Sequence, residues 1–338
     1  MPIVDAHLDL AYNVGRGRDV TKPAREQPIA ENEIATVGFP DLRAGGVGLV
    51  FATVFCGPDS PKHRGYRNPQ EAYEQALVQF DQYDAWFHVR ELTPWTGRVS
   101  ETDRSVVQAL ILLEGAEAIR TIEDAQAFYD RGMRVVGLSW QKTRYAGGTS
   151  TPGPLTDEGR MLVRELDRLG VLHDASHLAE RSFWDLLHAT DQRVVASHSN
   201  CRSIVGRDPN ERHLTDAMIR EIVARGGVVG INFFDRFLMP FAEYGKRRCN
   251  LEDVVAHVKH ICDLAGSDRY VGIGTDMDGG LGREQIPGEI ETSEHLSRVG
   301  EALRKANFSD EAIDRFMGGN WIRIAQTLAP ITIKDSLI

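Results

Sequence analysis

Short apolar or β-branched runs recur along this chain and alternate with stretches of helical period. There are eight of them, at Ile3–Asp9, Val47–Phe55, Val106–Leu113, Val135–Trp140, Val171–His177, Val194–His198, Val228–Phe233 and Tyr270–Thr275. Strands that alternate with helices form a parallel sheet, and eight such units close into a barrel. The pattern therefore predicts an α/β fold of the (β/α)8 TIM-barrel type.

The segments between these runs carry helix signals. Leucines at 162, 166 and 169 follow Thr156, a residue type that caps helices, and Gly132, Gly170 and Gly226 stand where helices are expected to end. A doubly wound open sheet is the competing fold, but no Gly-x-Gly-x-x-Gly follows the first run. Because we find no linker that marks a second domain, we expect one barrel domain over residues 1–338.

The composition, with 42% hydrophobic and 26% charged residues, is that of a globular protein. A net charge of −10 argues against nucleic acid as a partner, because phosphate binding needs clustered Lys and Arg. No segment approaches the roughly 18 consecutive apolar residues of a membrane span, and the first run starts too early to leave room for a signal peptide. We therefore expect no membrane partner and a cytoplasmic location. The four cysteines form no Cys-x-x-Cys, which disfavours a zinc ribbon.

Residue types that bind metal ions stand where several of the runs end. They are His7, Asp9, Glu114, His177, His198 and Asp276. The carboxyl ends of the strands face the active site in barrels of this kind. Imidazole nitrogens and carboxylate oxygens without thiolates suit Zn²⁺ or a neighbouring divalent ion. Six such residues at one end of five strands favour a metal site over a chance arrangement.

This set can accommodate two ions. Side chains alternate along a strand, so His7 and Asp9 point to one side and can bind one ion. His177 and His198 lie on adjacent strands, about 4.8 Å apart, and can bind the other. Glu114 can bridge the two ions with its two oxygens. Two ions roughly 3.5 to 4 Å apart can hold a water, lower its pKa and polarise a carbonyl, and the nucleophile would then be the bridging hydroxide.

Each of these residues also has an ordinary structural interpretation. A lone buried histidine is more often a hydrogen-bonded core residue, and Asp276 could build a turn with the Asp-Gly that follows it. Asp5 and His173, deeper in the expected barrel, fit a role beside the ligands and an ordinary buried role equally well. His257 and His260 are spaced to share one face of a helix, which we expect to be its solvent side.

Six short motifs follow one another along the chain. They are Asp5-Ala6-His7-Leu8-Asp9, Leu113-Glu114-Gly115, Asp174-Ala175-Ser176-His177, Ala196-Ser197-His198-Ser199-Asn200, Gly227-Val228-Val229-Gly230-Ile231-Asn232-Phe233 and Gly274-Thr275-Asp276-Met277-Asp278-Gly279. In order, spacing and strand position they resemble the renal (membrane) dipeptidase family of zinc peptidases, from residue 3 to about residue 326. The resemblance implies a barrel of the metal-dependent hydrolase type and two zinc ions, with His7 and Asp9 on one ion, His177 and His198 on the other, and Glu114 between them.

The resemblance also implies roles in binding and catalysis. Asp276 would take the proton from the attacking water and return it to the leaving amine. Arg212 would hold the C-terminal carboxylate of a dipeptide, a task that suits a bidentate guanidinium, and Asn232 would contact the substrate. The expected activity is hydrolysis of the amide bond of a dipeptide, with L,L and L,D dipeptides both open as substrates. A homodimer is expected by analogy with the family alone.

Two positions depart from the family pattern. Trp140 stands where animal members carry a substrate-contacting histidine, and its indole N–H can donate one hydrogen bond but cannot act as an imidazolium. Phe234 stands where some relatives have a tyrosine hydroxyl. Lys142, Arg144 and Tyr145 follow Trp140 and are either replacement donors or exposed loop residues.

Two other functions therefore stay open. The same pair of ions could serve another hydrolase, which acts on a different amide, a lactam ring or an N-acyl amino acid. The chain could also be a catalytically silent barrel that binds a metal ion or a small ligand, although the presence of Asp276 argues against this alternative.

Overall fold

The strands of the molecule form a curled parallel sheet. The computed structural model describes residues 1–60, 65–100, 102–103, 105–206 and 208–332. Six strands pair in the order β1 (Ile3–Leu8), β2 (Val47–Phe55), β4 (Gln108–Glu114), β5 (Met133–Gly137), β8 (Leu172–Asp174) and β9 (Val194–Val195). Two further parallel strands, β10 (Val229–Ile231) and β11 (Val271–Ile273), pair with each other. Each of these strands lies in, or overlaps, one of the predicted runs.

Backbone hydrogen bonds join the two groups of strands into a closed barrel. The N–H of Gly230 donates to the carbonyl of Ala196 at 2.8 Å and links β10 to the end of β9. The N–H of Asp276 donates to the carbonyl of His7 at 3.2 Å and links the end of β11 to β1. The predicted (β/α)8 architecture is thereby confirmed, and the last bond places Asp276 beside His7.

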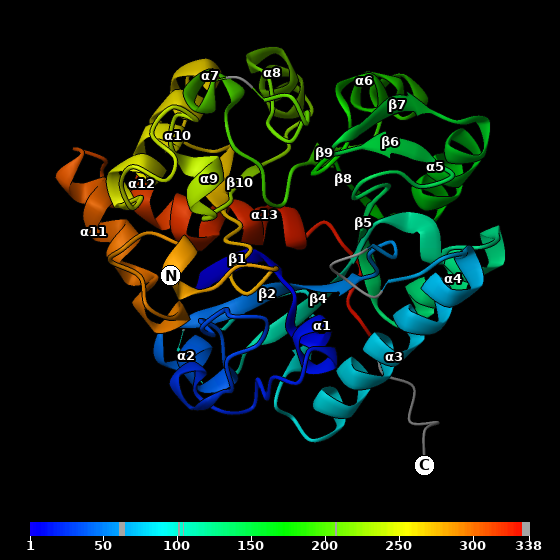
Figure 1. Cartoon of the computed structure of the whole chain (residues 1–338), viewed down its shortest axis with the longest axis horizontal. Helices are drawn as coiled ribbons and strands as arrows, with labels where there is room; N and C mark the ends of the chain where they lie inside the picture. Colours follow the sequence, from blue (N-terminus) through cyan, green and yellow to red (C-terminus); the bar gives the residue numbers. More distant parts are fainter. Residues whose placement is uncertain (61–64, 101, 104, 207, 333–338) are drawn as a thin grey trace.

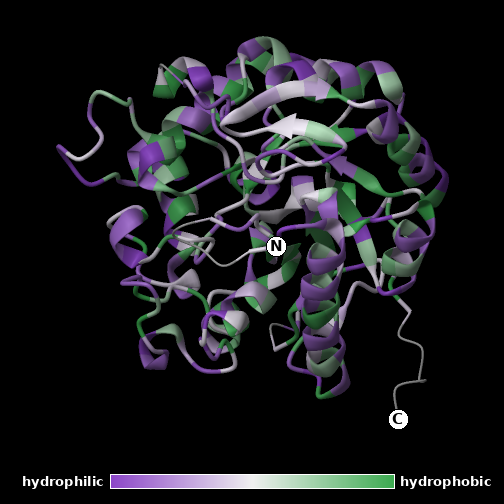
Figure 2. Ribbon diagram, turned by 45° about the vertical axis from the view of Figure 1, so that its right-hand side comes forward, coloured by the Kyte–Doolittle hydropathy of each residue, from purple (hydrophilic) through white to green (hydrophobic). Residues whose placement is uncertain are grey.

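Helices surround this barrel. Their bounds are α1 (Leu10–Gly15), α2 (Phe39–Ala44), α3 (Pro69–His88), α4 (Ile122–Asp130), α5 (Asp157–Leu169), α6 (Glu180–Ala189), α7 (Arg202–Val205), α8 (Asp216–Ala224), α9 (Asp235–Leu238), α10 (Leu251–Ala265), α11 (Ser297–Lys305), α12 (Asp310–Asp314) and α13 (Asn320–Ala325). Figure 1 shows β1, β2 and β4 in the middle, with α3 and α4 to one side and α10, α11 and α12 to the other. Hydrophobic and hydrophilic residues alternate along the helices in Figure 2, as in helices that bury one face against a sheet.

The helix α5 begins and ends where the sequence predicts. The hydroxyl of Thr156 accepts a hydrogen bond from the N–H of Gly159 at 3.0 Å, which caps the first turn. Gly170 ends the helix with a φ of 70°, in the left-handed region that glycine enters without a steric penalty. The chain can therefore turn directly into β8, the strand that leads to the next residues of the site.

The barrel interior is divided into an apolar part and a polar end. Leu110 and Leu112 of β4 belong to the apolar cluster, together with Phe51 of β2. Helix α13 packs on this cluster through Trp321, whose ring meets that of Phe51 edge-on with the centroids 5.3 Å apart. Side chains alternate along a strand, so Glu114, two residues beyond Leu112, points the same way and enters the polar end.

Several residues of the polar end lie past the strand ends rather than on them. Strands β8 and β9 each end three residues before His177 and His198, so the predicted strand ends at these histidines are wrong. The carboxylate of Asp174 accepts the N–H of Ser176, two residues further along the chain, at 2.9 Å, and such local side-chain bonds compete with the strand ladder. His177 and Asp276 have φ values of 67° and 60°, a conformation that few residues with a side chain adopt.

A short hairpin that the sequence did not predict follows β5. Its strands are β6 (Ala146–Gly148) and β7 (Thr151–Leu155), and it lies beside α5 and α6 in Figure 1. A further short strand, β3 (Thr93–Pro94), pairs with the start of β4. The turn of the hairpin brings the hydroxyl of Thr149 to 3.0 Å from Nδ1 of His177, so the hairpin contributes to the polar end of the barrel.

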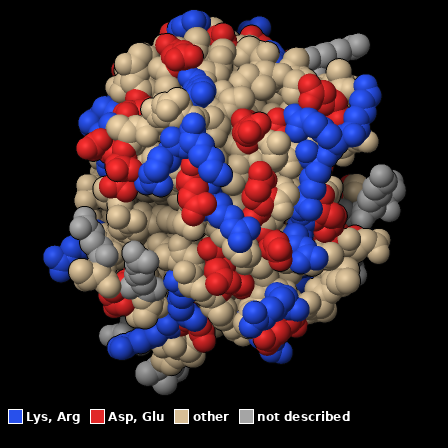
Figure 3. Space-filling model, turned by 90° about the vertical axis from the view of Figure 1, so that its left-hand side faces the viewer, with Lys and Arg blue, Asp and Glu red and all other residues tan. Residues whose placement is uncertain are grey.

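The outer surface carries both signs of charge. On the face drawn in Figure 3, Lys and Arg side chains lie interspersed with Asp and Glu side chains. Ion pairs such as Arg304 with Asp310 at 2.8 Å and Arg315 with Asp268 at 2.7 Å join opposite charges. No helix in the described part of the chain has both the length and the apolar character that crossing a membrane requires.

Candidate metal centre

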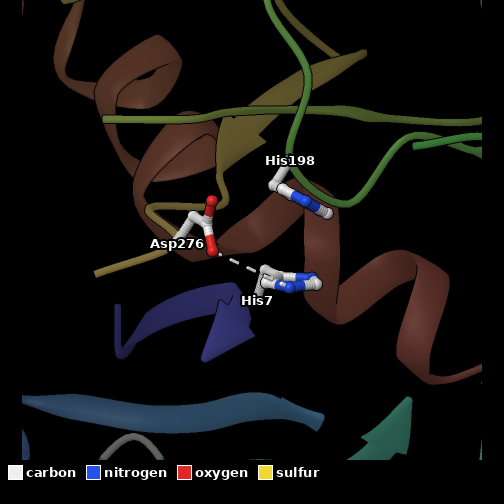
Figure 4. A group of neighbouring side chains, drawn as sticks. All are labelled: His7, His198 and Asp276. Carbon is white, nitrogen blue, oxygen red and sulfur yellow. Dashed lines mark ion pairs between the residues drawn. The ribbon is translucent and has the colours of Figure 1, made fainter. Parts of the chain in front are cut away.

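Side chains from separate strands converge at the polar end of the barrel. Three overlapping groups bring their ligand atoms within 4.8 Å of one another: His7, His198 and Asp276; Glu114, His177 and His198; and His7, Asp9 and Glu114. Figure 4 shows the first group, with His7 near the end of β1, His198 in the segment after β9 and Asp276 after β11, lying next to one another. The structure thus brings all six predicted ligand-type residues together.

Glu114 lies between two sets of histidines. Its Oε2 is 3.3 Å from Nε2 of His7, and its Oε1 is 3.1 Å from Nε2 of His177 and 3.5 Å from Nε2 of His198. The two oxygens of one carboxylate therefore face two different sides of the site. This is the geometry that a carboxylate shared by two cations requires.

Asp9 approaches Glu114 and His7 from the start of α1. The hydroxyl of Thr53 on β2 donates a short hydrogen bond to Oδ1 of Asp9. The N–H of Asn13 in the same helix donates to the carbonyl of Asp9 at 3.1 Å. These contacts hold the carboxylate at the edge of the cluster, where it joins the group formed with His7 and Glu114.

Burial and mutual charge strongly perturb the titration of these groups. Burial opposes protonation of His7, but the Glu114, Asp9 and Asp276 carboxylates outweigh it and raise its pKa to about 10. Burial, with a further contribution from Glu114, raises the pKa of Asp9 to about 6, and burial raises the pKa of Asp276 to about 8 despite the opposing effect of His7. Three carboxylates confined in a buried site call for positive charge beside them.

Divalent cations fit this donor set. Nε2 of His7 is buried and has no hydrogen-bond partner among the described residues. Nε2 of His177 and Nε2 of His198 approach to 2.9 Å, and burial lowers the pKa of His177 to about 4. Where both of these nitrogens carry lone pairs, the two neutral imidazoles repel unless a cation lies beside both. The residues therefore fit metal ions, with only nitrogen and oxygen donors.

Asp276 is positioned by Asn232. Nδ2 of Asn232 donates to Oδ2 of Asp276 at 2.8 Å, and Oδ1 of Asn232 accepts from the N–H of Phe234 at 2.7 Å. Asn232 is fully buried, and both ends of its amide are engaged inside the protein. The amide that was predicted to contact the substrate thus also orients Asp276.

Arg212 reaches the same site from the segment after α7. Its Nη1 donates to the hydroxyl of Ser199 at 2.9 Å and its Nη2 to the carbonyl of His198 at 2.6 Å. The side chain is buried, its Cζ lies 5.2 Å from the ring centroid of Phe237, and its Nε has no hydrogen-bond partner among the described residues. The guanidinium is thus held firmly beside the metal cluster and retains unused N–H donors, among them the one on Nε.

Trp140 lines the site on the side of His177. The two ring centroids are 6.0 Å apart, and Trp140 also meets Phe55 edge-on at 5.4 Å. Tyr145, which follows Trp140 closely, is neither a replacement donor nor an exposed loop residue, the two alternatives predicted for it. It is buried and donates its hydroxyl proton to the carbonyl of Ile119. Because this hydroxyl is buried and bonded within the protein, it is not available to a substrate.

The structure also decides two other expectations from the sequence, those for His257 and Asp5. His257 is fully buried, not solvent-facing: its Nδ1 accepts the N–H of Cys201 at 3.1 Å and its Nε2 lies 3.0 Å from the carbonyl of Leu238. Asp5 accepts the N–H and the hydroxyl of Thr275 at 2.9 and 2.6 Å. Asp5 therefore holds the segment that carries Asp276 against β1. This is the role beside the site residues, one of the two roles left open for Asp5.

Several residues that touch the cluster were not predicted from the sequence. Ser197 and Asp174 lie behind the histidines, Thr149 contacts His177, and Thr53 contacts Asp9. Ser197 and Asp174 stand inside motifs that were singled out, beside the expected ligands. Thr149 and Thr53 have no such signal, because their proximity depends on the hairpin and on the pairing of β1 with β2.

A (β/α)8 barrel with histidines and carboxylates converging beyond its strand ends defines a metal-dependent hydrolase. A model of one family matches residues 1–335, and its description is membrane dipeptidase, peptidase family M19. The chain belongs to this family, and it is accordingly a dipeptidase of the metallopeptidase class.

The chain is also similar to individual proteins. A protein of Klebsiella pneumoniae described as an uncharacterized protein in the pqqA 5′ region is 32% identical over 61% of this chain and 76% of its own length. The dipeptidase tcpJ of Claviceps purpurea is 26% identical over 98% of this chain and 78% of its own length. A metallopeptidase of Rhodobacter sphaeroides, solved with a phosphinate mimic of the dipeptide L-Ala-D-Ala, superposes with a TM-score of 0.79 at 24% identity, covering 97% of this chain and 99% of that one.

Proposed function

We propose that this dipeptidase cleaves dipeptides with a free C-terminal carboxylate at a site that holds two zinc ions. The observation that carries the proposal is the position of Glu114, whose two oxygens face His7 on one side and His177 with His198 on the other. In this assignment His7 and Asp9 hold one ion, His177 and His198 hold the second, and Glu114 contacts both. When bound, such ions lower the pKa of water and polarise the scissile carbonyl.

Asp276 is the group that moves protons. Its Oδ1 faces His7 Nε2 at 3.9 Å, while Oδ2 is fixed by Asn232, so one oxygen is free to accept a proton. We assign to Asp276 the removal of a proton from the attacking water and its transfer to the leaving amine. The oxygen of that water bonds to the carbonyl carbon, the C–N bond breaks, and the proton leaves with the amine.

Arg212 is assigned the recognition of the C-terminal carboxylate of the substrate. A buried guanidinium that has given two bonds to the protein still has donors in its planar fork. A dipeptide carboxylate placed there would lie a fixed distance from the cluster, which restricts cleavage to very short peptides. Trp140, beside His177, is assigned a contact with the bound peptide through its ring and its indole N–H.

A panel of dipeptides and related amides tests this function. The purified enzyme, reconstituted with zinc, is assayed with L,L and L,D dipeptides, with the same dipeptides amidated at the C-terminus, and with N-acyl amino acids and a lactam. We expect turnover of the free dipeptides and at least a hundredfold lower kcat/KM for the amidated forms. Faster turnover of the N-acyl amino acids or the lactam would replace dipeptides by that substrate class.

Three broader proposals accompany this function. We propose that residues 1–338 form one catalytic domain, a unit that limited proteolysis should leave intact. We propose a cytoplasmic location, supported by the four free cysteines, of which Cys56, Cys201 and Cys249 are buried, since disulfides are rare in reducing compartments. We also propose a homodimer, by family analogy, which light scattering of the purified protein would test.

A further inference from the structure

One hydroxyl group lies behind two of the histidines of the metal centre. Oγ of Ser197 is 2.8 Å from Nδ1 of His198 and 3.2 Å from Nδ1 of His7. The rings of His7 and His198 lie 3.6 Å apart, so the same oxygen can reach both. In the assignment above these histidines hold different ions, and Ser197 is therefore a contact common to both halves of the site.

The proton of this hydroxyl is already committed. Ser197 donates it to Oδ2 of Asp174 in a short hydrogen bond. Oδ1 of the same carboxylate accepts the N–H of Ser197 at 2.8 Å and the N–H of Ser176 at 2.9 Å. All of these groups are buried, so water does not compete for the carboxylate. A charged acceptor binds a hydroxyl proton more strongly than a neutral imidazole nitrogen does.

The tautomers of both imidazoles follow from the single proton of the Ser197 hydroxyl. A hydroxyl has one proton and two lone pairs, and the proton of Ser197 points to Asp174. Toward His7 and His198 the oxygen can only accept, so each ring must carry its proton on Nδ1. A neutral imidazole protonated on Nδ1 has its lone pair on Nε2. In both rings Nε2 faces Glu114, at 3.3 Å from His7 and 3.5 Å from His198.

We propose that Ser197, polarised by Asp174, is a positioning residue that fixes the metal-binding tautomer and the ring orientation of His7 and His198 together, and so couples the affinities of the two metal sites. The inference rests on the proposed two-metal function, and it adds a single hydroxyl on which both ions depend. Hydrogen-bond partners behind histidine ligands typically contribute 10- to 100-fold in metal affinity.

The third histidine provides a contrast inside the same site. Nδ1 of His177 lies 3.0 Å from Oγ1 of Thr149, in the turn of the β6–β7 hairpin. Thr149 Oγ1 can donate to the carbonyl of His177 at 3.5 Å and accept from Nδ1, which again leaves Nε2 for a metal ion. His177 therefore has its own support, from a different element. Loss of Thr149 should weaken the binding of one ion alone.

Zinc affinity of the metal-free protein is the measurement that tests the proposal. Wild-type protein and Ser197→Ala, stripped with a chelator, are titrated with Zn²⁺ in competition with a chromophoric chelator, which gives two dissociation constants. We expect Ser197→Ala to weaken both by about 10- to 100-fold. Ser197→Thr keeps the hydroxyl and should restore most of the affinity. Thermal melting of the metal-free proteins checks that each variant is folded.

Two further variants separate the role of the proton from that of packing. Asp174→Asn keeps the size of the side chain but removes the charged acceptor, so the hydroxyl of Ser197 can turn its proton toward a ring, and zinc binding should weaken although Ser197 is present. Ser176→Ala removes a neighbouring hydroxyl 3.3 Å from Ser197 Oγ, which accepts the backbone N–H of His198 at 3.1 Å but contacts neither ring, and its effect on both constants should be much smaller than that of Ser197→Ala. Thr149→Val should weaken one constant only.

The possible results divide clearly. Parallel weakening of both constants in Ser197→Ala, with recovery in Ser197→Thr, supports the coupling. Unchanged constants, weakening of one constant alone, or an equal loss in Ser176→Ala would overturn it. These titrations involve no substrate, so the tautomer assignment stands or falls independently of whether dipeptides are hydrolysed.

Discussion

Asn232 donates to one oxygen of Asp276 at 2.8 Å, and the other oxygen of Asp276 lies 3.9 Å from Nε2 of His7. This division of the carboxylate into a fixed oxygen and a free oxygen leads to a direct prediction. Asp276→Asn keeps the shape but cannot take a proton, so kcat should fall by about 10²- to 10⁴-fold while the zinc content is retained. Steady-state kinetics with metal analysis of the same sample would check it, and full activity would remove Asp276 from the mechanism.

Arg212→Met should raise KM for free dipeptides by about 100-fold or more, because two charge-assisted hydrogen bonds to the carboxylate are lost. The same variant should change KM little for dipeptides amidated at the C-terminus, which offer no carboxylate. Arg212→Lys is the matched control: it keeps the charge but not the planar fork and should show an intermediate loss. Equal kinetics of Arg212→Met and wild type with free dipeptides would contradict the assigned contact.

Removal of the metal should abolish hydrolysis and return of zinc should restore it. Each chain should take up two zinc ions, since Glu114 faces ligands on two sides. Activity measured against zinc added per chain should therefore rise until two equivalents are present. Saturation of both activity and binding at one equivalent would contradict the two-ion site.

Trp140→Phe removes the indole N–H but keeps an aromatic ring against Phe55 and His177. If that N–H donates to the substrate in the transition state, kcat should fall by about tenfold or more with little change in stability. Trp140→Ala, which also removes the ring, should raise KM in addition. Wild-type kinetics in Trp140→Phe would leave Trp140 with a packing role only.

His257 makes the stability of the protein depend on pH. Burial lowers its pKa from 6.5 to about 4, so the unfolded chain binds a proton more tightly than the folded protein does. Its contribution is complete above pH 6.5 and is lost as the pH falls toward 4, by at most about 3 kcal/mol.

Urea unfolding of the metal-free protein between pH 7.5 and pH 4.5 would measure this contribution. In His257→Asn, which keeps an acceptor for the N–H of Cys201, the decrease in free energy of unfolding on acidification should be smaller than in wild type. An identical pH dependence in the two proteins would show that His257 does not titrate as described.

Much of the site could be predicted from local sequence because its residues follow the strands. In a parallel barrel all strand ends meet at one rim, so His7, Glu114, His177, His198 and Asp276 could be grouped before any distance was known. The prediction was less accurate where local hydrogen bonds compete with the strand ladder, as at Asp174, which ends β8 three residues before His177.

Contacts between distant segments could not be predicted in this way. His257 was expected on the solvent side of its helix, but α10 turns that face toward Cys201 and Leu238. The bond between Asn232 and Asp276 was not predicted either. Each of these contacts depends on how one element is rotated against another, and the spacing of residues along a single element carries no information on that rotation.

The sequence by itself determined the barrel and the set of side chains at its rim, because strand periodicity and strand order are local properties of the chain. The tertiary structure alone decided how those side chains are held. It placed both oxygens of Glu114 between separate histidines and set Ser197 behind His7 and His198. Hydrogen-bond geometry depends on tenths of an ångström, and only the packing of the closed barrel fixes distances at that scale.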